Sequence, residues 1–150
     1  MSNTTTKLAE IEVSYRPKKS HHPIIKSSAD AYYHLLKFFP EKTISLQESF
    51  VVLYTNRANK IIGVYELSKG GITGTVADPR LVLSVALKTA ATGIILAHNH
   101  PSGNLQPSIQ DQDITKKIQD ACKLLDITLL DHLIVVPEDA YFSFADEGLL

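Results

Sequence analysis

Residues 93–111, with the sequence GIILAHNHPSGNLQPSIQD, determine how this chain is interpreted. The short apolar run 93–97 is typical of a buried strand, and His98 and His100 follow directly at its carboxyl end. In an extended backbone, side chains two residues apart project from the same face, so both imidazoles can reach one point. The pattern predicts a pair of histidines where a central strand leaves the core.

A carboxylate can join the two histidines from the segment that follows them. Residues 101–107 contain two prolines, a glycine and an asparagine, which predict a loop rich in turns. Ser108 is a typical residue to begin a helix, with Asp111 in its first turn. Two imidazoles and one carboxylate form a three-ligand set that leaves a fourth position open, as catalytic zinc sites do. Alternatively, Ser108 and Asp111 serve only as a helix cap.

This arrangement resembles the JAMM (JAB/MPN) metalloprotease motif: His98, His100, seven residues, Ser108, two residues, Asp111. The segments HNHPSG and PSIQD resemble the RadC-like branch in particular, where Asn99 fits, although deubiquitinating members usually have Ser or Thr at that position. The similarity runs over residues 28–150. It implies a JAB/MPN, cytidine-deaminase-like fold, in which a curved mixed sheet is flanked by helices. It also implies one zinc ion per chain, held by the two histidines and Asp111.

The same resemblance implies catalytic roles for two further residues. The JAMM motif takes its general base from a glutamate at an earlier strand edge, and Glu48 matches because it precedes the apolar run 50–54. Without the motif, Glu48 would be interpreted as a solvated residue at the start of a strand. Glu66, on the next predicted strand, is the second candidate. Ser108 matches the serine that donates a hydrogen bond to the oxyanion of the tetrahedral intermediate.

The remaining sequence alternates between helical and extended patterns. Helices are predicted from Ser27 or Ser28 to near Pro40, from Asp78 through Ala91 with apolar residues on most sides, and from Ser108 with Ile114, Ile118, Ala121 and Leu125 on the buried face. Strands are predicted at 50–54, 61–67, 93–98, 128–136 and 141–144. This alternation predicts a layered α/β fold with a mixed sheet.

The composition fits one globular domain. The chain has 150 residues, 44% hydrophobic and 21% charged, with a net charge of −1, so no overall field attracts it to nucleic acid or an anionic membrane. No apolar run reaches the roughly 20 residues that a membrane span needs. The single cysteine, Cys122, excludes an intramolecular disulfide and fits a reducing compartment. We therefore expect a cytoplasmic enzyme without membrane contacts.

Residues 1–26 are predicted to be an arm or linker before a domain at 27–150, and residues 1–6 are expected to be disordered. Residues 11–15 alternate between apolar and polar, which fits a short edge strand or an arm. The basic segment with Arg16, Lys18 and Lys19 is interpreted as a solvated connector, with weak nucleic-acid binding as the alternative. No downstream residue completes a metal site for His21 and His22.

The function predicted from these features is zinc-dependent hydrolysis of an amide or isopeptide bond in a peptide or protein. Two alternatives remain: a DNA-repair-associated accessory protein without peptidase turnover, and a metal-binding scaffold. Asp131 and His132 interrupt an apolar strand. We expect them to form a buried, hydrogen-bonded pair, with a contact to the metal site as the alternative.

Overall fold

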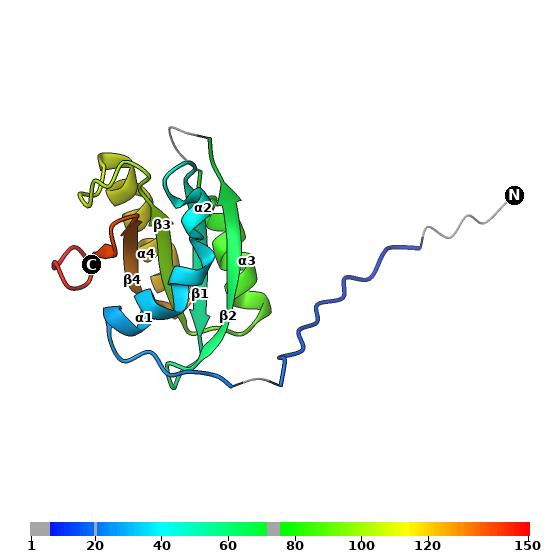
Figure 1. Cartoon of the computed structure of the whole chain (residues 1–150). Helices are drawn as coiled ribbons and strands as arrows, with labels where there is room; N and C mark the ends of the chain where they lie inside the picture. The colour runs from blue at the N-terminus through cyan, green and yellow to red at the C-terminus, as the bar shows by residue number, and fades with distance from the viewer. Residues whose placement is uncertain (1–6, 20, 72–75) are drawn as a thin grey trace, which may run out of the picture.

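A computed structural model describes residues 7–19, 21–71 and 76–150 (Figure 1). Residues 1–6, where disorder is predicted, lie outside the described residues. Residues 7–19 contain no helix or strand, so the strand considered at 11–15 is not formed. Instead they make an exposed arm that leads away from the folded part, with Ile11 91% and Val13 72% exposed.

A mixed sheet of five strands forms the centre of the fold. The strands are β1 (Ser49–Thr55), β2 (Ile61–Lys69), β3 (Gly93–Asn99), β4 (Thr128–Val136) and β5 (Ala140–Ser143). Their spatial order is β2-β1-β3-β4-β5. The pair β3–β4 is parallel, and the other neighbouring strands are antiparallel. This confirms the predicted layered α/β fold.

Helices cover both faces of the sheet (Figure 1). One face carries α1 (Ser28–Leu35), the 3-10 helix η1 (Leu36–Phe38) and α2 (Glu41–Ile44); the other carries α3 (Pro79–Lys88) and α4 (Ile109–Leu124). The predicted caps are present: the Ser27 side chain accepts from the Asp30 N–H, and the Asp78 side chain accepts from the Arg80 N–H. Because strand side chains alternate, β1 contributes to a core on each face.

The first helical segment continues past Leu35 as the 3-10 helix η1 and ends at Phe38, near Pro40 as predicted. The other two helices differ from the prediction in detail. The helix α3 ends at Lys88 rather than Ala91, and its apolar residues are not all buried, because Leu81 and Leu87 are 45% and 58% exposed. A helix on a sheet buries one stripe, here centred on two fully buried side chains, Val82 and Ala86. Leu125, expected on the buried face, is the C-cap of α4 and is 41% exposed.

The strand order brings segments that are distant in the sequence to one end of the central strands. Because β1 is antiparallel to β3, Phe50 near the start of β1 pairs with His98 near the end of β3. Because β4 is parallel to β3, its residue His132 lies opposite Leu96, two residues before His98. The N-terminus of α4 returns to the same end after the loop at residues 100–108. The predicted site residues therefore meet at the carboxyl end of β3.

Candidate metal centre

The two histidines and the asparagine between them point to opposite sides of β3. His98 and His100 face the side that carries α4, and their Nε2 atoms lie 3.0 Å apart. Asn99 is buried on the other side, where its amide donates to the carbonyls of Ile44 and Gln47, both at 2.9 Å, and accepts from the Ser49 N–H at 2.7 Å. The side chain of Asn99 therefore fixes the backbone on both sides of Glu48.

The loop after β3 returns the chain to the histidines. Gly103 has φ of 83°, and a Cβ there would lie 3.0 Å from the Glu138 carboxylate, so glycine suits this turn. Ser108 then caps α4: its Oγ accepts from the Asp111 N–H at 3.0 Å, and the Asp111 carboxylate accepts from the Ser108 N–H at 2.8 Å. This reciprocal capping box points the Asp111 carboxylate toward His100.

The predicted ligand atoms converge on one point. The Asp111 carboxylate lies 3.2 Å from Nε2 of His98 through Oδ1 and 3.2 Å from Nε2 of His100 through Oδ2. One ligand atom from each of the three residues lies within 4.8 Å of the others, which is close enough to hold a metal ion. Among the described residues, this is the group of histidines, cysteines and carboxylates found to meet that condition. The helix cap and the ligand role coexist in Asp111, since they use different lone pairs.

Hydrogen bonds at the opposite ring atoms favour metal binding. Nδ1 of His100 lies 2.6 Å from the Asn104 carbonyl, which only accepts, so Nδ1 carries a proton and, in the neutral ring, Nε2 has the lone pair. Nδ1 of His98 lies 2.8 Å from Nε2 of His132. A cation bound by both Nε2 atoms, which lie 3.0 Å apart, would need a free lone pair on each of them. The donor set fits a divalent metal with nitrogen and oxygen ligands.

The charges of the site are coupled. Burial alone would raise the pKa of Asp111, but its contacts with the imidazoles of His100 and His98, followed by the hydrogen bond from the Ser108 N–H, outweigh it and hold the pKa of this carboxyl well below its usual range. Burial alone would lower the pKa of His100, but its contacts with Asp111 and the Asn104 carbonyl, together with the charge of Glu48, raise it. An anionic Asp111 is the form that a metal ion requires.

Asp131 and His132 are both buried, and the Asp131 carboxylate accepts a hydrogen bond from the His132 backbone N–H at 2.7 Å, as the predicted pair requires. Their side chains nevertheless face opposite sides of the sheet, because adjacent strand residues do so. Asp131 accepts from the Ser143 hydroxyl at 2.6 Å and from the Ala145 N–H at 3.0 Å, and burial raises its pKa. The side chain of His132 contacts His98 instead, which is the alternative considered above. Burial, followed by the charge of His98, holds the pKa of His132 well below its usual value.

Sequence reasoning missed Thr115. Its hydroxyl lies 2.5 Å from the Asp111 carbonyl and 2.6 Å from Nδ1 of His132. The available signal was the helical spacing of 4, 3 and 4 residues along one face of α4, through Asp111, Thr115, Ile118 and Cys122. A polar residue in that buried row indicates a polar partner inside the core.

An open pocket of about 430 Å³ leads to the metal ligands. Glu48 and Ser108 line it together with His98, His100 and Asp111, and apolar contacts come from Phe50, Val76, Ala77 and Ile114. Glu66 is not among the lining residues; it lies on β2 in an exposed ion pair with Lys69, with 3.3 Å between the charged atoms. The structure thus brings Glu48 and Ser108 to the candidate metal ligands and leaves Glu66 outside their pocket.

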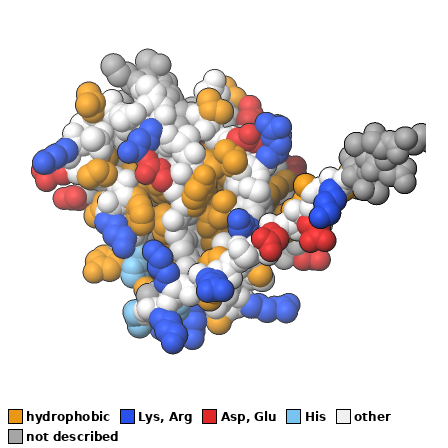
Figure 2. Space-filling view, turned by 90° about the vertical axis from the view of Figure 1, so that its right-hand side faces the viewer, with side chains coloured by type: hydrophobic (Ala, Val, Ile, Leu, Met, Phe, Trp, Pro, Cys, Tyr) orange, Lys and Arg blue, Asp and Glu red, His pale blue; other side chains and the backbone are white. Residues whose placement is uncertain are grey.

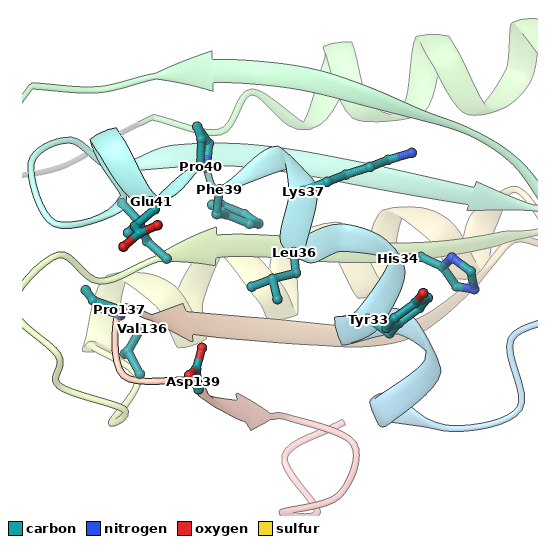
Figure 3. Close-up of a pocket in the computed structure, with 11 residues that line it drawn as sticks. Tyr33, His34, Leu36, Lys37, Phe39, Pro40, Glu41, Val136, Pro137 and Asp139 are labelled. Atoms are coloured by element: carbon teal, nitrogen blue, oxygen red, sulfur yellow. The ribbon is translucent and has the colours of Figure 1, made fainter.

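A larger cavity, about 980 Å³, lies on the opposite side of the sheet (Figure 3). It is an open groove between α1, η1 and α2 and the end of β4, and its lining mixes Leu36, Phe39 and Pro40 with charged side chains such as Lys37 and Asp139. Its lining contains none of the three residues of the metal-ligand group. Size alone therefore does not identify the functional site in this protein.

A His-His-Asp donor set at the end of a central strand, with Glu48 lining the same pocket, is the arrangement that the resemblance to the JAMM motif predicts. Comparison with protein families agrees: the model of the RadC-like JAB domain matches residues 25–149. This chain belongs to the RadC-like JAB domain family.

Curated relatives support this assignment. The chain is 50% identical to a UPF0758 protein of Flavobacterium johnsoniae over 125 residues, covering 83% of this chain and 53% of the relative. It is 43% identical to a UPF0758 protein of Porphyromonas gingivalis over 149 residues, covering 99% and 66%. A UPF0758 protein of Streptococcus gordonii is 46% identical over 101 residues, covering 67% and 44%. The matched part of the chain thus covers between 44% and 66% of the length of these relatives. Within the described ranges, no helix has the length and apolar character needed to cross a membrane.

Proposed function

We propose that this protein is a metal-dependent hydrolase of the JAMM type that uses zinc to cleave an amide or isopeptide bond in a peptide or protein. One observation carries the proposal: the Nε2 atoms of His98 and His100 and the carboxylate of Asp111 converge beside an open pocket. His98, His100 and Asp111 would hold the zinc ion, which would supply Lewis acidity and a water made nucleophilic at neutral pH.

Glu48 is the best-placed general base. Its carboxylate lines the pocket and is close enough to His100 for its charge to raise the pKa of that imidazole. Within the part of the chain that the structure describes, no hydrogen bond or ion pair engages this carboxylate. Glu48 would therefore accept a proton from the attacking water and return it to the amine that leaves. The hydrogen bonds of the Asn99 side chain to Gln47 and Ser49, which we call the Asn99 clamp, hold the backbone of Glu48 in place.

Ser108 fits a catalytic role in addition to its role as the N-cap of α4. As the cap of α4, its oxygen accepts a hydrogen bond from the Asp111 N–H. A hydroxyl that accepts at one lone pair still has its own hydrogen to donate. Ser108 lines the pocket beside the ligands, so this hydrogen would stabilise the oxyanion that forms when water attacks a carbonyl.

The test separates metal binding from turnover. Glu48→Gln keeps the size of the side chain but removes the base, so zinc should remain at about one equivalent per chain while cleavage of a peptide library falls by about 10²–10⁴. Glu66→Gln is the matched control and should change neither quantity. Elemental analysis and mass spectrometry of the products provide the two measurements. Loss of zinc in Glu48→Gln, or loss of turnover only in Glu66→Gln, would contradict the assignment.

The accessory-protein alternative has one observation in its favour, the exposed basic side chains of Arg16, Lys18 and Lys19. Figure 2 shows acidic as well as basic side chains on the arm, so the field along it is mixed. We therefore predict weak DNA binding that disappears as salt increases. Fluorescence anisotropy with duplex and single-stranded DNA measures it. Tight binding at physiological salt that survives removal of residues 1–23 would favour the accessory function instead.

A further inference from the structure

The imidazole of His132 is fully enclosed and held in one orientation. The side chain is 0% exposed. The ring of Phe144 stacks on it with centroids 4.7 Å apart and an angle of 14°, and the ring of His98 lies 4.9 Å away. This packing leaves its two nitrogens facing two fixed partners, Thr115 on α4 and His98 on β3.

The hydrogen bonds run from the Asp111 carbonyl through Thr115 and His132 to His98, and the carbonyl sets the direction of each one. The Asp111 carbonyl can only accept, so the single hydroxyl hydrogen of Thr115 is used there, at 2.5 Å. The Thr115 oxygen must then accept from Nδ1 of His132, at 2.6 Å, which places a proton on that atom. Nε2 of His132 is left as an acceptor for the Nδ1–H of His98, at 2.8 Å.

We propose that His132 is a positioning residue of the metal centre, which accepts a hydrogen bond from His98 and keeps that ring in the tautomer with a free Nε2 lone pair. The inference rests on the proposed metal site, because the free lone pair matters only if it binds a cation. It points at His100 and Asp111, the other two ligands. Partners of this kind fix the orientation of a metal-binding histidine, and losing one typically costs about 10- to 100-fold in metal affinity.

A pair of substitutions separates this role from simple core packing. His132→Phe keeps an aromatic ring against Phe144 but removes the acceptor, whereas His132→Gln loses the ring but can place an oxygen near the position of Nε2. If His132 positions His98, zinc affinity should fall by about 10- to 100-fold in His132→Phe and by clearly less in His132→Gln. Competition with a chromophoric chelator measures both affinities. The opposite order, with His132→Phe close to wild type, would overturn the proposal.

A second measurement does not depend on zinc or on the stability of these variants. In metal-free protein labelled with ¹⁵N in histidine, long-range ¹H–¹⁵N spectra should show His98 protonated at Nδ1 and unprotonated at Nε2. Thr115→Val removes the oxygen that orients His132, so this single tautomer should be lost, while Thr115→Ser should preserve it. A wild-type His98 protonated at Nε2, or a spectrum unchanged by Thr115→Val, would overturn the proposal.

The outcomes also separate this inference from the metal centre itself. A wild-type protein that binds no zinc would contradict the proposed function. A wild type that binds zinc no more tightly than His132→Phe would contradict the positioning role alone. His34→Gln, on α1 at the other face of the sheet, is the control for a histidine change away from the centre and should leave zinc affinity unchanged.

Discussion

His98 and His100 offer the same atom to the same point, yet the protein holds them in different ways. The His98 side chain is 2% exposed, and its Nδ1 is bonded to a residue 34 positions away in the sequence. The His100 side chain is 13% exposed, and its Nδ1 is bonded to a backbone carbonyl four positions away. The core thus holds His98, whereas the position of His100 depends on the loop that follows β3. We call them the core-held and the loop-held half of the centre, and the two should respond differently to the same perturbation.

Removing either ligand gives the largest expected effect. His98→Ala and His100→Ala should both lose bound zinc, because two ligands hold a catalytic metal poorly. In metal-free protein, His98→Ala should also reduce the free energy of unfolding by about 2–4 kcal/mol, since it leaves a cavity and an unsatisfied partner in the core. His100→Ala should reduce it by less than about 1 kcal/mol. Elemental analysis and urea unfolding in the presence of a chelator provide the two numbers; equal losses of stability would contradict the contrast.

Asn99 tests whether the ligands and the base can be perturbed separately. Asn99→Ala removes three hydrogen bonds of a buried side chain, which hold the backbone around Glu48 on the face away from His98 and His100. Zinc should stay bound, while turnover should fall by up to about 10²-fold because small displacements of a catalytic group are costly. In a Glu48→Gln background, the same substitution should cost little further rate, since both changes act through one group. Additive losses in the double variant would show that Asn99 acts on something other than Glu48.

The parts of this site that were predictable are those encoded by short spacings. The spacing of two residues in a strand places His98 beside His100, and a capping position three residues into a helix places Asp111. Glu48 was identified through family resemblance, and the antiparallel register of β1 and β3 then brings it to the same edge. Its clamp by Asn99 was not foreseen, because the partner carbonyls belong to a segment about 50 residues away in the sequence.

The internal network of the centre required the tertiary structure. His132 and Thr115 lie on different elements, and their contact depends on the parallel register of β3 with β4 and on where α4 docks. The hydrogen bond of the Asp131 carboxylate with the His132 N–H is local and was predicted, but the alternation of strand side chains sends the two side chains to opposite faces, so the imidazole meets His98. The burial predicted for Leu125 is also wrong, because a helical pattern extended to its last residue does not show where the helix stops covering the sheet.

The smallest predicted effect concerns pH and the loop-held half of the centre. The raised pKa of His100 means that its imidazole stays protonated above the usual value of about 6.5. Zinc must displace that proton, so affinity should weaken as pH falls through the raised pKa, by about tenfold per pH unit for one proton. In Glu48→Gln the loss of a nearby negative charge should lower this pKa and shift the curve toward lower pH by a fraction of a unit. Zinc competition between about pH 5.5 and 8 measures both curves. An affinity that does not change over this range, or a curve that Glu48→Gln leaves in place, would contradict the raised pKa of His100 and the part that Glu48 plays in it.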